Sequence, residues 1–296
     1  MYLDCRCIQT AEILNGMISY ENHMERKKIM LDLIQAEWQK LRRCQILLIG
    51  IVALTLCPVV QYGTQLVIAP EYRDAAFDFT KLFANVVWGN SQTFLPISLV
   101  MLGGWLIDRE SASDTLKNIT VIPIPTSRLL LAKLLLTALC ALLFGGYSVL
   151  VTVLTGFLFG LPGLSLSVLF GGGIQILAAA FTSYLVCAPL ILIFGQIRGA
   201  YLGGSILAFF LGYSMLFFKG GFLLSAYPFS AALILTGFDM QEYNGATSAP
   251  NLLLAAVGLL FAITATVLLL FFADQKGEVT PPPKKKKRAA RSVRRS

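Results

Sequence analysis

Charged side chains are scarce in this chain. Of its 296 residues, 14% are charged and 56% are hydrophobic, whereas soluble domains usually carry about 25% charged residues and about 45–50% apolar ones. The apolar residues fall into long runs without charge, each near the ~20 residues that a helix needs to cross the hydrocarbon of a bilayer. A soluble globular domain is therefore excluded, and the composition predicts an all-α polytopic membrane protein.

Catalytic and nucleotide-binding motifs are missing as well. No H-E-x-x-H, G-x-S-x-G or G-x-x-x-x-G-K-[ST] pattern occurs, and the one histidine, His23, precedes the predicted spans. These absences argue against a metalloprotease, a serine hydrolase and a P-loop ATPase. The spans hold no clear charge away from their ends, which argues against a proton relay. We expect a non-catalytic subunit that binds no metal or cofactor itself.

Apolar runs predict a six-helix transmembrane domain over about 44–273. The stretch between the fifth and sixth spans, 219–249, contains a shorter apolar segment that Pro228 interrupts. That segment is too short to span and suits a re-entrant or outer hairpin. The six predicted spans lie at about 45–67, 83–107, 130–158, 165–195, 199–218 and 250–273.

The polar N-terminal segment, 1–43, is expected to contain an amphipathic helix at about 24–43. Met30, Ile34, Trp38 and Leu41 recur on one side of it at helical spacing. A tryptophan and a basic end just before a span favour a helix lying on the inner membrane surface. An ordinary cytosolic helix is the alternative.

Basic residues indicate the orientation of the chain. Seven Lys or Arg precede the first span, nine follow the sixth, and three lie in the loop at 108–129, while the opposite face carries Arg73, Lys81 and Lys219. By the positive-inside rule both termini and this loop are cytoplasmic in a cell membrane. The polybasic tail, 274–296, is expected to be disordered and to contact anionic lipid rather than nucleic acid.

The loop at 108–129 contains the most informative pattern. Ser111 or Ser113 is expected to cap a short helix, which two prolines then end, and a new helix is expected to start at Thr126 or Ser127. A short rigid helix held between two spans can act as a lever.

This loop strongly resembles that of the permease subunits of ABC-2 type transporters. Their pattern is a Glu, a Gly-Thr, a Leu-Lys, a Pro, a Ser-Arg and then a Lys at the start of the next helix. Asp114 replaces the usual Gly. The overall look is most similar to the branch of bacitracin-export and lantibiotic-immunity permeases. The matching residues are Glu110, Thr115, Leu116, Lys117, Pro123, Ser127, Arg128 and Lys133.

The resemblance implies an export or immunity system driven by a separate ATPase dimer, which binds the ATP and Mg. Two permease subunits, identical or homologous, would sit above it and expel an amphiphile such as an antimicrobial peptide. The short helix at about 111–120 and the interfacial helix would transmit the motion of the ATPase. For Glu110 and Arg128 the alternative is that they cap helices at the membrane boundary. The resemblance implies coupling roles for Glu110, Thr115, Lys117, Pro123 and Arg128.

Amides inside the spans are a second set of candidates. Asn85, Asn90 and Gln92 lie in the second span and Gln175 lies in the fourth. Because unpaired amides facing lipid are unfavourable, we expect them in the bundle interior or at a subunit interface. They could line a transport pathway or form ordinary interhelical hydrogen bonds.

Two other function classes stay open at this stage. An ATP-independent channel or secondary carrier predicts an internal repeat or charged pore residues, and a membrane enzyme needs a polar catalytic cluster. The sequence supplies none of these features clearly. The permease hypothesis therefore leads.

Overall fold

The computed structural model describes residues 35, 38, 39, 41, 45–68, 71, 77–112 and 126–279. These residues fold into helices and short connections, and no strand occurs among them. The all-α class is confirmed, and the long apolar helices agree with a polytopic membrane protein. Four helices are long and apolar enough to cross a membrane: α2 (Ile46–Val67), α6 (Thr126–Leu158), α7 (Leu166–Gly195) and α12 (Leu252–Val279) over its stretch to Ala273.

The second predicted span is one helical run made of three parts. α3 (Phe79–Gly89) passes directly into a π-helical segment, η2 (Asn90–Phe94), and then into α4 (Leu95–Ala112). Pro96 follows the π turn and has no N–H for the carbonyl of Gln92, four residues earlier. The run therefore changes its hydrogen-bond pattern near its middle, where the sequence is polar.

The fifth predicted span is α8 (Tyr201–Ser214), which ends in a 3-10 turn, η3 (Met215–Phe217). The segment expected to form a re-entrant or outer hairpin contains three short helices, and the first two meet at Pro228. Pro228 stands at the first turn of the second of them, a position that its fixed φ and missing N–H suit. These helices are α9 (Gly221–Ala226), α10 (Pro228–Ile234) and α11 (Met240–Asn244).

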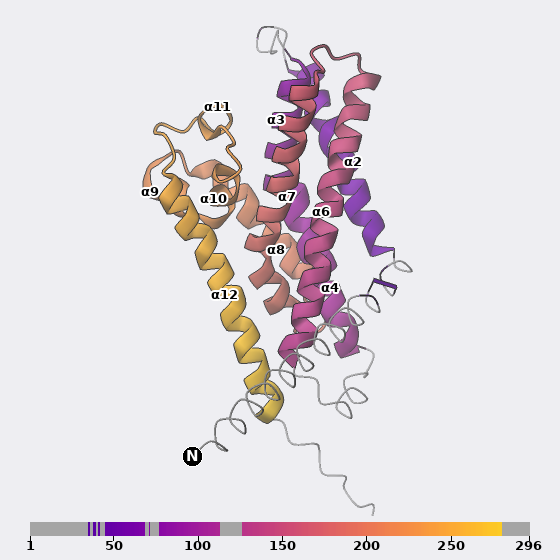
Figure 1. The fold of residues 1–296 in the computed structure, drawn as a ribbon, viewed down its shortest axis with the longest axis vertical. Coiled ribbons are helices and arrows are strands. Elements are labelled where there is room, and N and C mark those ends of the chain that lie inside the picture. Colours follow the sequence, from indigo (N-terminus) through magenta and orange to yellow (C-terminus); the bar gives the residue numbers. More distant parts are fainter. Residues whose placement is uncertain are drawn as a thin grey trace, which may run out of the picture.

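The bundle has two distinct ends (Figure 1). At one end α4 finishes and α6 begins; we call it the loop end, because residues 113–125 join these helices. At the other, the distal end, α3 begins and α9, α10 and α11 gather. α12 runs from these short helices back to the loop end. α7 lies at the centre and contacts α3, α4, α6, α10 and α12.

Glycines allow α4 to lie very close to α7 and to the start of α8. A Cβ added to Gly103 would lie 2.7 Å from a side-chain carbon of Ile191, and one added to Gly104 would lie 2.8 Å from Cβ of Tyr201. Small residues at such crossings let helix backbones approach and pack. α4 is thus packed directly against α7 and α8 over its second half.

Candidate functional site

The candidate coupling loop is shorter than the predicted 108–129. Residues 108–112 continue α4 and residues 126–129 belong to α6. The prediction that Ser111 caps a new helix is wrong, because α4 has no proline or glycine near this point and runs on to Ala112. The alternative cap, Ser113, lies outside the described residues. The predicted helix start at Thr126 is confirmed.

Lys133 joins the two helices that carry this loop. Its side chain is 1% exposed, and Nζ donates a hydrogen bond of 2.5 Å to the carbonyl oxygen of Leu106 in α4. A buried lysine needs such a partner, because an unpaired polar group in an apolar interior is costly. Lys133 therefore links α6 to α4 two turns before α4 ends.

Asp108 joins α4 to the connection between α7 and α8. The side chain is 7% exposed, and Oδ1 accepts a hydrogen bond of 3.0 Å from the backbone N–H of Gly199. Gly199 has a φ of +71°, which glycine adopts without the steric strain of a Cβ. Nearby, the guanidinium of Arg109 lies 5.3 Å from the ring centroid of Trp105, a cation–π distance. The end of α4 is held on two sides.

The structure places the predicted coupling residues unequally. Glu110 lies in the last turn of α4, and Arg128 lies exposed in the first turn of α6. Thr115, Lys117 and Pro123 lie outside the described residues. A basic residue at a helix N-terminus opposes the helix dipole. Favourable dipole capping therefore does not account for Arg128.

Two of the three amides in the second span, Asn90 and Gln92, lie at the π turn. Asn90 is 1% exposed, and its Nδ2 donates a hydrogen bond of 2.8 Å to Oγ of Ser148 in α6. Gln92 is also buried, while Asn85 is half-buried in α3. Asn90 Oδ1 and Ser91 Oγ have no hydrogen-bond partner among the described residues. Asn90 thus makes an ordinary interhelical bond while keeping one acceptor unused.

Gln175 does not join this group. It lies half-buried on α7 and lines a groove between α3 and α7 near the distal end. In the sequence the four amides form one set of candidates. In the structure Asn90 and Gln92 lie at the π turn, Asn85 lies in α3, and Gln175 lines this groove.

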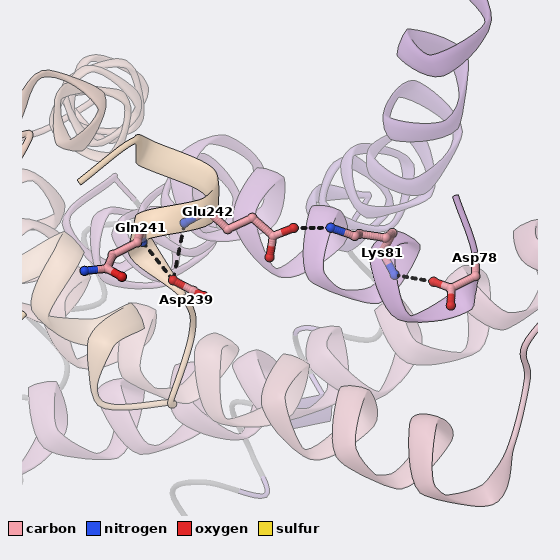
Figure 2. A network of polar contacts seen from close by, with 5 residues as sticks. All are labelled: Asp78, Lys81, Asp239, Gln241 and Glu242. Atoms are coloured by element: carbon pink, nitrogen blue, oxygen red, sulfur yellow. Dashed lines mark hydrogen bonds and ion pairs between the residues drawn. The ribbon is translucent and has the colours of Figure 1, made fainter. Parts of the chain in front are cut away.

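At the distal end, α11 is joined to α3 by polar contacts (Figure 2), and aromatic contacts lie beside them. Lys81 of α3 forms an ion pair with Glu242 of α11, and their side chains are 36% and 47% exposed. The Asp78 carboxylate accepts the backbone N–H of Lys81 and so caps α3. Beside them, the rings of Trp88 and Phe238 stack with centroids 5.8 Å apart.

The described cysteines are separate from one another and buried. Cys57, Cys140 and Cys187 carry free thiols in α2, α6 and α7. No group of three or more His, Cys, Asp or Glu side chains that could hold a metal ion lies in the described part of the chain. At the loop end, the side chains of Lys133 and Asp108 bond to backbone atoms, and the guanidinium of Arg109 lies against the ring of Trp105.

Comparison with known proteins adds one finding. A family model described as ABC-2 family transporter protein matches residues 33–215. The match covers more than half of the chain and includes α4, α6, the loop between them, α7 and α8. No curated protein matches the chain.

Proposed function

The chain belongs to the ABC-2 family of transporter proteins, and from this premise we propose that its loop end couples the helix bundle to a separate ATPase dimer. Membership makes the chain a membrane permease component of an ABC transporter. The proposal adds the place and the means of coupling: the ATPase contacts the segment between α4 and α6, and the bundle follows its movement. ATP and Mg are bound by the ATPase, since this sequence has no P-loop.

The main support for this proposal is that α4 is bonded to two neighbouring parts of the bundle at the loop end. Lys133 fixes α4 to α6, and Asp108 fixes α4 to the α7–α8 connection. A push on the loop therefore reaches three helices through hydrogen bonds of buried side chains. Because α4 lies close to α7 and α8 at Gly103 and Gly104, a movement of α4 is transmitted to these two helices. A loosely attached loop would dissipate the same push locally.

The charges beside the loop support a protein contact there. Arg128 lies in the first turn of α6, where the helix dipole opposes its charge. A complementary surface on the ATPase would offset that cost. Glu110 stands on the other side of the loop, and Thr115, Lys117 and Pro123 lie between them in the sequence. These five residues form the proposed coupling surface, on the cytoplasmic side of a six-span bundle with both termini cytoplasmic.

The proposed cargo is an amphiphile expelled from the cell, such as an antimicrobial peptide, moved by two permease subunits. Its support is the resemblance to bacitracin-export and lantibiotic-immunity permeases. The alternative, an ATP-independent channel or carrier, gains no specific support. Of the described residues, the two charged ones that are buried are Asp108 and Lys133, and both bond backbone groups at the loop end.

Affinity co-purification tests the proposal. The tagged full-length chain is purified in mild detergent from its native cells, and its partners are identified by mass spectrometry. We expect a stoichiometric P-loop ATPase, and we expect Glu110→Ala with Arg128→Ala to reduce its recovery. The matched control removes one acid and one base at the distal end, Glu242→Ala with Lys81→Ala, and keeps the ATPase.

The two double variants distinguish the possible results. Equal recovery with both double variants would remove Glu110 and Arg128 from the contact. Repeated recovery of the chain without any ATPase would contradict the coupling proposal and favour the channel or carrier.

A further inference from the structure

The second span changes its hydrogen bonding in the middle of the bundle. The N–H of Leu95 bonds the carbonyl oxygen of Asn90, five residues earlier, and the N–H of Asn90 is shared between the carbonyl oxygens of Val86 and Val87. An α-helix bonds four residues back, so the π turn holds one more residue than an α turn. Pro96 comes two residues after the π turn and has no N–H to donate. Prolines and π turns are two common causes of helix bends.

The π turn separates two clusters of buried apolar side chains. Those of α3, such as Leu82, belong to a cluster shared with α9 and α11 at the distal end. Those of α4, such as Leu99, belong to a cluster that reaches Leu130 at the start of α6. The buried residues 90–92 between them are polar. Phe94, the last residue of the π turn, packs against both clusters.

Three polar side chains in this part of the second span are buried with hydrogen-bonding capacity unused. Asn90 Oδ1 and the hydroxyls of Ser91 and Ser98 have no hydrogen-bond partner among the described residues, and each of these residues is at most 3% exposed. An unpaired polar group in an apolar interior is costly. A bent helix frees backbone carbonyls, and serine hydroxyls readily bond carbonyls three or four residues earlier. A bent form of the second span therefore offers partners that the present form lacks.

The neighbouring first span carries a proline at the same level. A Cβ added to Gly89 would lie 2.4 Å from Nε2 of Gln61 and 3.2 Å from Sγ of Cys57, so α2 lies very close to the end of α3 here. Pro58 follows Cys57 inside α2 and has no N–H for the carbonyl of Leu54. Both of these adjacent helices thus lack a backbone hydrogen bond near the middle of the bundle.

We propose that the π turn is a joint at which the second span bends, so that α3 and α4 change the angle between them and the hydroxyls of Ser91 and Ser98 gain carbonyl partners. The joint gives the chain two forms. An ATPase that moves the loop end would shift the balance between these forms, because α4 is bonded there and α3 is bonded at the distal end. Only this last step rests on the proposed function, since the two forms belong to the chain itself.

Fluorine NMR of the full-length chain in lipid nanodiscs tests the joint. Phe94→4-trifluoromethylphenylalanine places a reporter against both clusters. Phe218→4-trifluoromethylphenylalanine is the matched control, because Phe218 packs against the distal cluster. We expect two forms at position 94, seen as two resonances or as relaxation dispersion of one, and a single form at position 218. Adding the ATPase with a non-hydrolysable ATP analogue should change the populations at position 94.

Ser91→Ala combined with Ser98→Ala tests the part played by the hydroxyls. We expect the less populated form at position 94 to fall about tenfold, which corresponds to ~1.4 kcal/mol. The midpoint of thermal unfolding should rise, because two unpaired polar groups leave the interior. Ser230→Ala is the matched control, since the buried hydroxyl of Ser230 bonds the carbonyls of Leu224 and Tyr227. It should lower the midpoint and leave both forms at position 94.

Three results would overturn the proposal. One is a single form at position 94 both in the chain alone and with the ATPase bound. The second is unchanged populations in the Ser91→Ala and Ser98→Ala double variant. The third is the same two forms at positions 94 and 218, which would mean that the movement is not confined to the joint. If no ATPase binds, the coupling proposal fails, and the chain alone decides the joint: two forms at position 94 support it and a single form overturns it.

Discussion

The two ends of the bundle are attached by different kinds of contact. At the loop end, Lys133 and Asp108 are buried and bond backbone atoms of neighbouring helices. At the distal end, Lys81 and Glu242 pair in an exposed position beside stacked aromatic rings. Hydrogen bonds to charged groups contribute about 1.5–3 kcal/mol when buried, and exposed ion pairs about 0.2–1 kcal/mol. The exposed ion pair between α3 and α11 is therefore expected to be weaker than the buried contacts of Lys133 and Asp108 at the loop end.

Lys133→Met should have the largest effect, because it removes the link between α4 and α6 while keeping an apolar side chain of similar length. We expect destabilisation by about 1.5–3 kcal/mol, seen as a lower midpoint of thermal unfolding in nanodiscs. Lys219→Met is the matched control, since Lys219 also donates to a backbone carbonyl, that of Asn244, but lies exposed at the distal end. Equal shifts in the two variants would abolish the difference between the ends.

Asp108→Ala should have the next largest effect. It leaves the N–H of Gly199 without its acceptor, and a partly buried unpaired group costs about 1–3 kcal/mol. Hydrogen exchange at residues 196–200 measures the loss directly and should become faster. Asp108→Asn keeps an acceptor oxygen and should stay close to the wild type; fast exchange in that variant too would mean that the carboxylate charge, and not the hydrogen bond, fixes the turn.

Glu242→Gln should have the smallest effect. It removes the charge of the ion pair with Lys81 and keeps the size of the side chain, so we expect a change of at most about 1 kcal/mol. The wild-type unfolding midpoint should fall slightly as salt rises, and that of the variant should not, because salt screens exposed charges. A shift as large as that of Lys133→Met would show that the distal attachment is as strong as the loop end.

The sequence predicted the long helices well because their signal is local. Runs of apolar residues without charge require a helix in a bilayer, and α2, α6, α7 and α12 each cover one predicted span. The π turn at Asn90–Phe94 was not predicted, although Pro96 and the polar residues before it were a signal. The short apolar stretch around Pro228 predicts a hairpin in 219–249, but the sequence does not divide this segment into its three short helices.

The candidate site was harder to predict because it depends on contacts between helices. Lys133 matches the family pattern, but the pattern does not predict its contact with α4. The burial of Lys133 depends on where α4 lies, which the sequence of α6 does not contain. For the same reason the sequence does not distinguish Asn90 from Gln175, although their neighbours place Asn90 in the interior and Gln175 in a groove.

Site-specific photo-crosslinking in cells tests the coupling claim most directly. Arg128→p-benzoylphenylalanine places a crosslinker on the exposed first turn of α6, and Lys219→p-benzoylphenylalanine places the same group at the distal end. Crosslinked partners are identified by mass spectrometry. The account predicts a P-loop ATPase bound to position 128 and none bound to position 219. An ATPase captured from position 219, or none captured from position 128, would contradict it.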